Sequence, residues 1–175
     1  KPRPAHRLDA NTTGLTLITR TRHFASLLQP QFARSEVKKN YLVRVQGHPE
    51  ADAFISDAPI SIEPGETGSR TVDSETGSPA KTEFQVLRRN EDGTTLLEAR
   101  PLTGRTNQIR IHLWQLGLPL CGDPLYLPDG RMGGTQTLAL GDPCLCLHAW
   151  KIRFKHPLTC EWVEFEAPEP AWAGR

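Results

Sequence analysis

The sequence predicts an α+β domain in which a mixed, largely antiparallel β-sheet is flanked by a few helices. Two observations predict this class. Segments with alternating or β-branched apolar residues outnumber segments with helical periodicity. Most connections between the predicted strands are too short for the crossover helices that a parallel sheet needs. No repeat or linker divides the chain, so residues 1–175 form one predicted domain.

The first half of the chain contains two predicted strands and one short helix. The strands span residues 15–20 and 37–45, and the helix spans residues 23–28. Thr21 is placed to cap the helix, and Pro30 is expected to end or kink it. In the second strand Tyr41 shares a face with three valines, so its ring is expected to be mostly buried.

The second half contains a hairpin, a helix and several short strands. A turn-rich excursion over residues 48–80, with one short strand near 58–62, precedes a hairpin of residues 81–88 and 94–101. A helix is expected to begin near Asn107 and to stop at Gly117. Further short strands are expected near residues 137–140, 144–148, 151–154 and 161–165.

Composition places the chain among ordinary globular proteins, with 37% hydrophobic and 23% charged residues. No apolar run approaches the roughly 20 residues that cross a bilayer. The four cysteines lack the regular spacing of a disulfide framework. We therefore expect a cytoplasmic protein with no membrane partner.

Charge is distributed unevenly along the chain despite a net charge of +1. Residues 1–48 carry nine Lys or Arg against two acidic residues, which gives a net charge of +7. Residues 49–80 carry seven acidic residues against Arg70 alone, which gives −6. One interpretation is a face that binds an anionic partner, and the other is two loops that neutralise each other in the fold.

Asp9 is the strongest candidate for a reactive group. It stands in a polar turn, two residues after Arg7 and directly before a predicted strand, which is a rigid base for a reactive side chain. The alternative is that its carboxylate only caps the turn of residues 9–12, as Asp often does.

Arg110 is the second candidate, on the predicted helix beside its apolar stripe. If its guanidinium is buried it requires a carboxylate, and Asp9 is a candidate partner. Three glutamates would serve equally well from sequence alone, namely Glu36, Glu83 and Glu98. The backbone N–H groups at the start of this helix could bind a phosphate, or Thr106 or Asn107 could simply cap it.

The cysteines do not form a convincing metal site. Cys144, Cys146 and His148 alternate on one predicted strand, where successive members stand about 7 Å apart. That spacing is wide for ligands converging on one zinc ion, and no CxxC or HxxxH pair is present. We expect buried cysteines and no metal. Patterns for a serine nucleophile, a P-loop or a dinucleotide site are also missing from the sequence.

Three segments together resemble the RluA branch of the pseudouridine synthases, enzymes that isomerise uridine in ribosomal or transfer RNA. They are His6-Arg7-Leu8-Asp9 with Thr13-Gly14-Leu15, then Lys38-Lys39-Asn40-Tyr41-Leu42-Val43, then the segment from Thr103 to His112. Downstream, Gly122-Asp123-Pro124-Leu125-Tyr126 and Leu147-His148-Ala149 also resemble the family, in the family's order.

The resemblance implies that Asp9 is the essential carboxylate during cleavage of the uridine C1′–N1 bond, and that Arg110 pairs with it. It implies that Tyr41 packs on the target base, with no metal or cofactor taking part. The uridine must leave the RNA helix or loop to reach the site, and Arg7 would brace the position it leaves. With Arg7, we expect further RNA contacts from Arg105, Lys38, Lys39, Asn107 and Gln108, in a monomeric protein.

The sequence departs from the family pattern in two places. The family usually has His where this chain has Asn107. The family also has a strand before the His6–Asp9 motif, so the catalytic domain is expected to be incomplete at its N-terminus. A non-catalytic RNA-binding protein remains an alternative function. A glycoside hydrolase is a third reading, which would need a second carboxyl group about 5–10 Å from Asp9.

Overall fold

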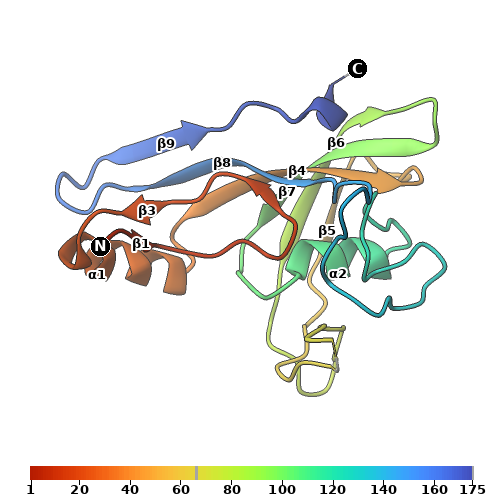
Figure 1. Cartoon of the computed structure of the whole chain (residues 1–175), viewed down its shortest axis with the longest axis horizontal. Coiled ribbons are helices and arrows are strands. Elements are labelled where there is room, and N and C mark those ends of the chain that lie inside the picture. Colours follow the sequence, from red (N-terminus) through yellow and green to blue (C-terminus); the bar gives the residue numbers. More distant parts are fainter. Residues whose placement is uncertain (66, 175) are drawn as a thin grey trace.

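The computed structural model of this chain describes residues 1–65 and 67–174 (Figure 1). Its strands are β1 (Arg3–Pro4), β2 (Thr13–Gly14), β3 (Ile18–Thr19), β4 (Lys38–Gln46), β5 (Ala53–Ser56), β6 (Thr82–Arg89), β7 (Thr94–Pro101), β8 (Leu147–Lys155) and β9 (Trp162–Glu166). Its helices are α1 (Arg22–Ala33), α2 (Gln108–Gln115) and the 3-10 turn η1 (Ala171–Ala173).

Seven of these strands form one mixed sheet. The order along its main path is β2-β8-β4-β7-β6-β5, and β9 also pairs with β8. Every pair in this sheet is antiparallel except β2 with β8. Strands β1 and β3 form a separate antiparallel pair below the sheet, close to α1 (Figure 1). The predicted α+β class, with its largely antiparallel mixed sheet, is confirmed.

The hairpin and the second helix form where the sequence predicted them. Strands β6 and β7 pair across a turn in which Gly93 has a φ of 80°. Helix α2 begins directly after Asn107 and ends before Gly117, whose φ of 74° suits a residue without a side chain. Both predictions depend on the conformation of a few neighbouring residues in a turn or at a helix end. Distant contacts do not change that conformation, so both predictions are confirmed.

The predicted strand over residues 15–20 is wrong, because the chain changes partners there. At Gly14 it pairs with β8, and a Cβ atom at this position would lie 2.2 Å from the carbonyl oxygen of Ala149. The backbone φ of Gly14 is 102°, which also favours glycine. Four residues later, Ile18 pairs with β1 instead.

The predicted end of the first helix is also wrong, because α1 continues through Pro30 to Ala33. Thr21 caps it as expected, its hydroxyl accepting a hydrogen bond from the N–H of Phe24 at 3.1 Å. Proline removes one helical hydrogen bond. Leu28 and Phe32, on either side of Pro30, pack in an apolar cluster with Ile152 under the sheet, which favours continuation of the helix.

Several strands lie elsewhere than predicted. The excursion contributes β5 rather than a strand at 58–62, where Ile60 makes only isolated bridges to Val72 and Ser78. Residues 137–140 form no strand, and β8 joins two predicted strands into one. In these segments short apolar runs predicted the strand boundaries poorly. Residues that are buried by loops have the same apolar sequence pattern as residues that are buried in a strand.

The main core lies between the sheet and α2. Its buried members come from β4, β6, β7, β8, α2 and the loops that follow α2: Val43, Val45, Phe84, Leu97, Ala99, Ile109, Leu113, Leu118, Leu120, Leu145 and Leu147. Tyr41 packs against this cluster from the sheet. Helix α2 is thereby fixed against the middle of the sheet, with its N-terminus beside the turn that contains Asp9.

Candidate active site

The turn that carries Asp9 is closed by its backbone and leaves the carboxylate free for another contact. The N–H of Thr12 donates to the carbonyl of Asp9 at 3.1 Å, and Asn11 takes the positive φ of 65° that such a turn requires. The Asp9 side chain instead accepts a hydrogen bond from the N–H of Asn107 at 2.9 Å. The interpretation of Asp9 as a turn cap is therefore wrong.

The N-terminus of α2 is occupied by the Asp9 carboxylate, where the sequence suggested a phosphate. The Asn107 N–H and the helix dipole both favour a negative charge there. Burial raises the pKa of the Asp9 carboxyl group above its ordinary value. The Asn107 N–H and the charges of Arg110, Arg7 and Lys39 oppose that rise in pKa. The result is a poorly hydrated carboxylate in a cationic setting, which suits a reactive anion.

Tyr41 lines the same cleft as Asp9. On β4 its cross-strand neighbours are Ala99 of β7 and Ala149 of β8, whose small side chains leave room beside the phenol ring. Burial and the charge of Asp9 raise the pKa of Tyr41, so the phenol stays protonated at neutral pH. The ring therefore offers a flat, uncharged wall for a base.

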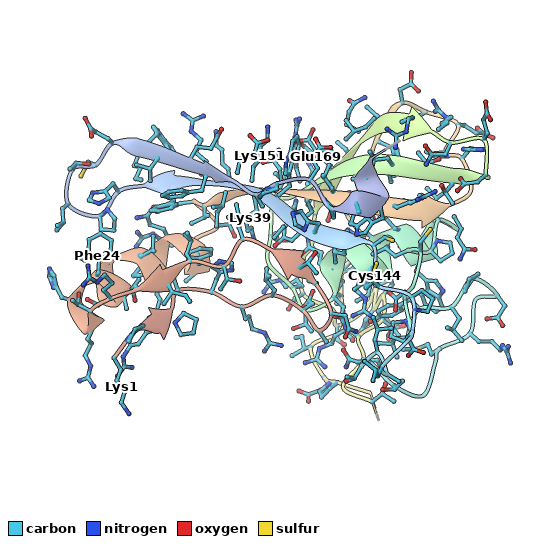
Figure 2. The ribbon with its side chains drawn as sticks, turned by 45° about the horizontal axis from the view of Figure 1, so that its top comes forward. Lys1, Phe24, Lys39, Cys144, Lys151 and Glu169 are labelled. Atoms are coloured by element: carbon cyan, nitrogen blue, oxygen red, sulfur yellow. The ribbon has the colours of Figure 1, made fainter. Side chains whose placement is uncertain are left out.

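Lys39, Arg7 and Arg105 bring positive charge to this cleft. Lys39 lies between the sheet and the N-terminal segment (Figure 2). Burial lowers the pKa of its ammonium group, and the charge of Asp9 opposes this lowering. Arg7 and Arg105 are exposed, and the Nε of Arg105 donates to the carbonyl of Pro79 at 3.0 Å. These three predicted RNA contacts are brought together around Asp9.

Arg110 does not pair with Asp9, and that expectation is wrong. Its side chain is completely buried (0% exposed), and its Nε and Nη2 atoms each lie 2.7 Å from an oxygen of Asp123. Asp123 also accepts the N–H groups of Leu125 and Tyr126 at 2.8 and 3.0 Å. A buried guanidinium does need a carboxylate, as the sequence argument held. That carboxylate is Asp123 of the Gly122-Asp123-Pro124 motif, which is not among the partners expected from the sequence.

Asn107 connects the Arg110 pair to Asp9. Its backbone is left-handed, with φ 56° and ψ 19°, and this turns its N–H toward Asp9. Its Oδ1 accepts from Nη1 of Arg110 at 3.0 Å, and its Nδ2 donates to the Tyr126 hydroxyl at 3.4 Å. Asn tolerates the left-handed region better than most residues. Asn107 is therefore a positioning residue between the catalytic candidate and a buried charge.

Three of the predicted RNA contacts are either buried or point away from the cleft, although Gln108 is among the residues that line it. Asn107 is 1% exposed and Gln108 is 3% exposed, so neither amide is available to a large ligand. The Gln108 side chain joins Arg105 N–H, Thr103 and the start of β6. Lys38 is exposed on the other side of β4 from Lys39, because side chains alternate along a strand. These corrections leave Arg7, Lys39 and Arg105 as the cleft cations.

His6 is a cleft residue to which the sequence reasoning gave no role of its own. Its Nε2 accepts a hydrogen bond from the N–H of Leu17 at 3.0 Å, and its ring stacks on Phe32 with centroids 4.7 Å apart. Burial lowers the pKa of this imidazole, which stays neutral and fixes the segment before Asp9. Its position in the His6–Asp9 motif was the signal that could have identified this bracing role.

The cysteines lie in different environments. Cys146 is buried, and burial raises the pKa of its thiol to about 12. Cys144 and Cys160 are exposed, contrary to the expectation of a cysteine core. In residues 1–65 and 67–174 no three His, Cys, Asp or Glu side chains gather as metal ligands.

The cleft itself has a volume of about 230 Å³. This is smaller than the roughly 300–1,000 Å³ of pockets for drug-sized ligands, and it suits a single flat base. Among the described residues that line it, Asp9 is the one carboxylate. A glycoside hydrolase would need a second carboxyl group in the cleft, so the lining argues against that function.

Comparison with known proteins points to one family. Residues 1–115 match the family model described as RNA pseudouridylate synthase. The chain is 39% identical to the dual-specificity RNA pseudouridine synthase RluA of Pasteurella multocida, over 94% of this chain and 72% of that protein. It is 37% identical to ribosomal large subunit pseudouridine synthase C of Vibrio parahaemolyticus, over 93% of this chain and 50% of that protein.

Solved structures give the same answer. Human RNA Pseudouridylate Synthase Domain Containing 1 superposes with a TM-score of 0.80 at 27% sequence identity, covering 97% of this chain and 70% of that one. Human RNA Pseudouridylate Synthase Domain Containing 4 superposes with a TM-score of 0.77 at 26% identity. The resemblance seen in the three sequence motifs therefore extends across the fold.

Proposed function

Since the chain belongs to the RluA branch of the RNA pseudouridylate synthases, we propose that it isomerises uridine in RNA to pseudouridine at the cleft around Asp9. The observation that carries this proposal is the meeting of Asp9 and Tyr41 from distant segments in one base-sized cleft. The cleft is rimmed by Arg7, Lys39 and Arg105, so the phosphates of a nucleic acid have cations on which to bind.

The reaction requires no oxidant and no reductant. The C1′–N1 glycosidic bond breaks, a C1′–C5 bond forms, the proton leaves C5, and N1 gains a proton. Asp9 is the group that can assist departure of the base, as a nucleophile or in a related role at the sugar or the base, because it is the one carboxylate among the described lining residues. The role of Arg110 is to bias Asp9 toward its ionised form through its buried charge.

Tyr41 is assigned to the base. Its ring stands beside Asp9 with two alanines as strand neighbours, so a uracil can pack against it while the glycosidic bond is broken. Burial and, to a smaller extent, the charge of Asp9 raise the pKa of Tyr41, so the phenol must lose its own proton before it can accept the proton from C5. If Asp9 forms a neutral ester with the sugar, that charge disappears and proton removal from C5 by Tyr41 becomes easier.

The target uridine must leave its stack to enter a cleft of this size, and extrusion costs a few kcal/mol. Arg7 precedes Asp9 by two residues and is exposed at the mouth of the cleft, where it can occupy the position that the base leaves. A uridine in a loop or at a mismatch costs less to extrude. The relatives are named for ribosomal large subunit RNA or for dual specificity, and ribosomal or transfer RNA is the proposed substrate class.

Residues 1–175 are proposed to act as one catalytic domain and as a monomer. The cytoplasm is the proposed location because ribosomal and transfer RNA are modified there in bacteria, from which the compared relatives come. No helix within the described residues is both long enough and apolar enough to span a membrane.

The test is to map pseudouridines in RNA from cells that lack the protein, and again after returning the wild-type or the Asp9→Asn gene. We expect one or a few sites to lose the modification, wild type to restore them, and Asp9→Asn to restore none. If all sites persist without the protein, or if Asp9→Asn restores them, the proposal is wrong. If the wild-type protein binds RNA but restores no pseudouridine, the result would favour the alternative of a non-catalytic RNA-binding protein.

A further inference from the structure

A basic and aromatic surface lies on the face of the sheet opposite α1 and the cleft. Trp162 at the start of β9 is 43% exposed. Three cations surround its ring: Arg153 at 4.9 Å, and Lys38 and Lys155 each at 5.6 Å from the ring centroid. We call these four residues the Trp162 patch.

Strand register gathers the patch from three strands. Lys38 of β4 is the cross-strand partner of Arg153, and Lys155 is the partner of Trp162. The intervening residues, such as Ile152 and Phe154, face the apolar cluster over α1. The alternation therefore places three cations and one indole on a single surface. These side chains point away from the apolar cluster and are not part of it.

The charge of this patch is largely unneutralised. Within the described part of the chain, none of Lys38, Arg153 and Lys155 takes part in an ion pair, whereas Lys151 nearby pairs with Glu166 at 3.3 Å. Two carboxylates lie on the same face: Glu164 is the cross-strand partner of Arg153, and Glu166 is the partner of Lys151. Cations interleaved with an exposed aromatic ring are the features of a surface that binds single-stranded nucleic acid.

The patch is connected to the catalytic cleft. A groove of about 540 Å³ shares Lys39 and Pro101 with the cleft and reaches Lys38 and Arg153 of the patch. Lys38 lies about 10 Å along β4 from Tyr41, given the rise per residue of a strand. The groove also contains three carboxylates, so binding strength is expected at the patch rather than along the groove: Glu36, Glu83 and Glu164.

We propose that the Trp162 patch is a second RNA-binding surface, which stacks a base near the target uridine on Trp162 and holds neighbouring phosphates on Lys38, Arg153 and Lys155. This inference rests on the proposed function, because it takes RNA as the ligand. It concerns binding of the flanking strand and leaves the chemistry at Asp9 unchanged. Base stacking on an aromatic ring is tolerant of sequence, so the patch would strengthen binding without selecting a site.

The test of the aromatic residue is the affinity for a 20-nucleotide oligouridylate, measured in an Asp9→Asn background so that no turnover occurs. Trp162→Ala should raise Kd at least about 5-fold, as expected for loss of one stacked base. Trp162→Phe should recover most of the affinity. Phe165→Ala is the matched control, because Phe165 is 50% exposed on the same strand but on the other face.

The test of the cations is the salt dependence of the same Kd. Neutralising Lys38, Arg153 and Lys155 to Gln should lower the slope of log K against log salt by about 2, which corresponds to three phosphate contacts on a single strand. Arg131→Gln removes an exposed charge that is not part of the patch and that pairs with Asp129, and it should leave the slope almost unchanged. Thermal melts must show that every variant is folded.

Unchanged affinity and unchanged slope in the Trp162 and triple variants would overturn the proposal, and the patch would then serve another ligand or only the sheet. In a background with Asp9 intact, the single-turnover rate constant at saturating RNA should be the same for patch variants and wild type. If wild type converts no uridine, the proposed function fails, while the binding measurements still decide whether the patch holds RNA.

Discussion

Lys38 and Lys39 are neighbours on β4, yet they belong to different parts of the molecule. Lys39 faces the cleft beside Asp9, where burial lowers the pKa of its ammonium group. Lys38 faces solvent on the opposite side of the sheet, beside Trp162. The same side chain in the two places has a different consequence, because charge acts strongly in a poorly hydrated cleft and weakly at an exposed surface.

The cations of the cleft and those of the outer face are expected to affect different steps, namely the reaction and the binding of RNA. In the cleft, Arg7 and Lys39 act on the Asp9 carboxylate, whose own charge is costly to bury. On the outer face, each cation acts on phosphates that remain in water and are screened by salt. Changes on the cleft side are therefore expected in the rate constant, and changes on the outer side in RNA affinity.

The largest expected effect comes from Asp9→Asn. Removal of the one described carboxylate of the cleft should lower the single-turnover rate constant by about 10³-fold or more at saturating RNA. The amide oxygen can still accept the N–H of Asn107, so the fold should persist. The measurement is pseudouridine formation over time in a substrate RNA, with RNA affinity measured in parallel.

The same variant makes a prediction about stability. Folding raises the pKa of Asp9, so its ionised form is disfavoured in the fold at pH values above that pKa. Asp9→Asn should therefore have an equal or higher Tm than wild type at neutral pH. The difference should shrink as the pH falls through the raised pKa toward the unfolded value. A lower Tm at neutral pH would contradict the inferred cost of burying this charge.

The next effect is on the framework behind the cleft. Arg110→Met leaves Asp123 buried and unpaired, which should cost about 3–5 kcal/mol and lower Tm by roughly 6–20 °C. Adding Asp123→Asn removes the stranded charge and should restore much of the Tm. The rate constant of the double variant should stay low, because the charge that biases Asp9 is still missing. Full recovery of both would assign Arg110 a purely structural role.

A smaller effect is expected at Asn107, which contacts both Asp9 and Arg110. Asn107→Gly keeps the left-handed backbone and the N–H to Asp9, whereas Asn107→Ala adds a strain of about 1–2 kcal/mol. Alanine should therefore reduce the rate constant more than glycine, and neither should change RNA affinity, because the side chain is buried. A loss of affinity with an unchanged rate constant would return Asn107 to the predicted RNA contacts.

Much of the fold follows from local signals in the sequence. Alternation located β4, the turn at Gly93 located the β6–β7 hairpin, and Gly117 located the end of α2. The strand after Asp9 was misjudged because its hydrogen bonds are divided between β8 and β1, which no local pattern records. Pro30 was misjudged because packing of Leu28 and Phe32 outweighs one lost hydrogen bond.

The sequence predicted which residues form the site better than it predicted which of them contact one another. Asp9, Tyr41, Arg7, Lys39 and Arg105 were all named from the sequence, and the structure brings them into one cleft. The partner of Arg110 was missed because two carboxylates, in segments far apart along the chain, compete for one guanidinium and only the fold decides between them. Strand alternation already placed Lys39 on the face of Tyr41 and Lys38 on the other face, and the structure shows that the Tyr41 face is the one that lines the cleft.

The most direct test of the reactive role of Asp9 is the pH dependence of kcat/KM for wild type, Lys39→Gln and Lys38→Gln. Because Asp9 must be ionised, kcat/KM should fall about tenfold per unit at pH values below the Asp9 pKa. The charge of Lys39 lowers that pKa, so Lys39→Gln should move the acid limb to higher pH. Lys38→Gln should weaken RNA binding and leave the limb in place. A profile without an acid limb, or an equal shift in both variants, would contradict the assignment of Asp9.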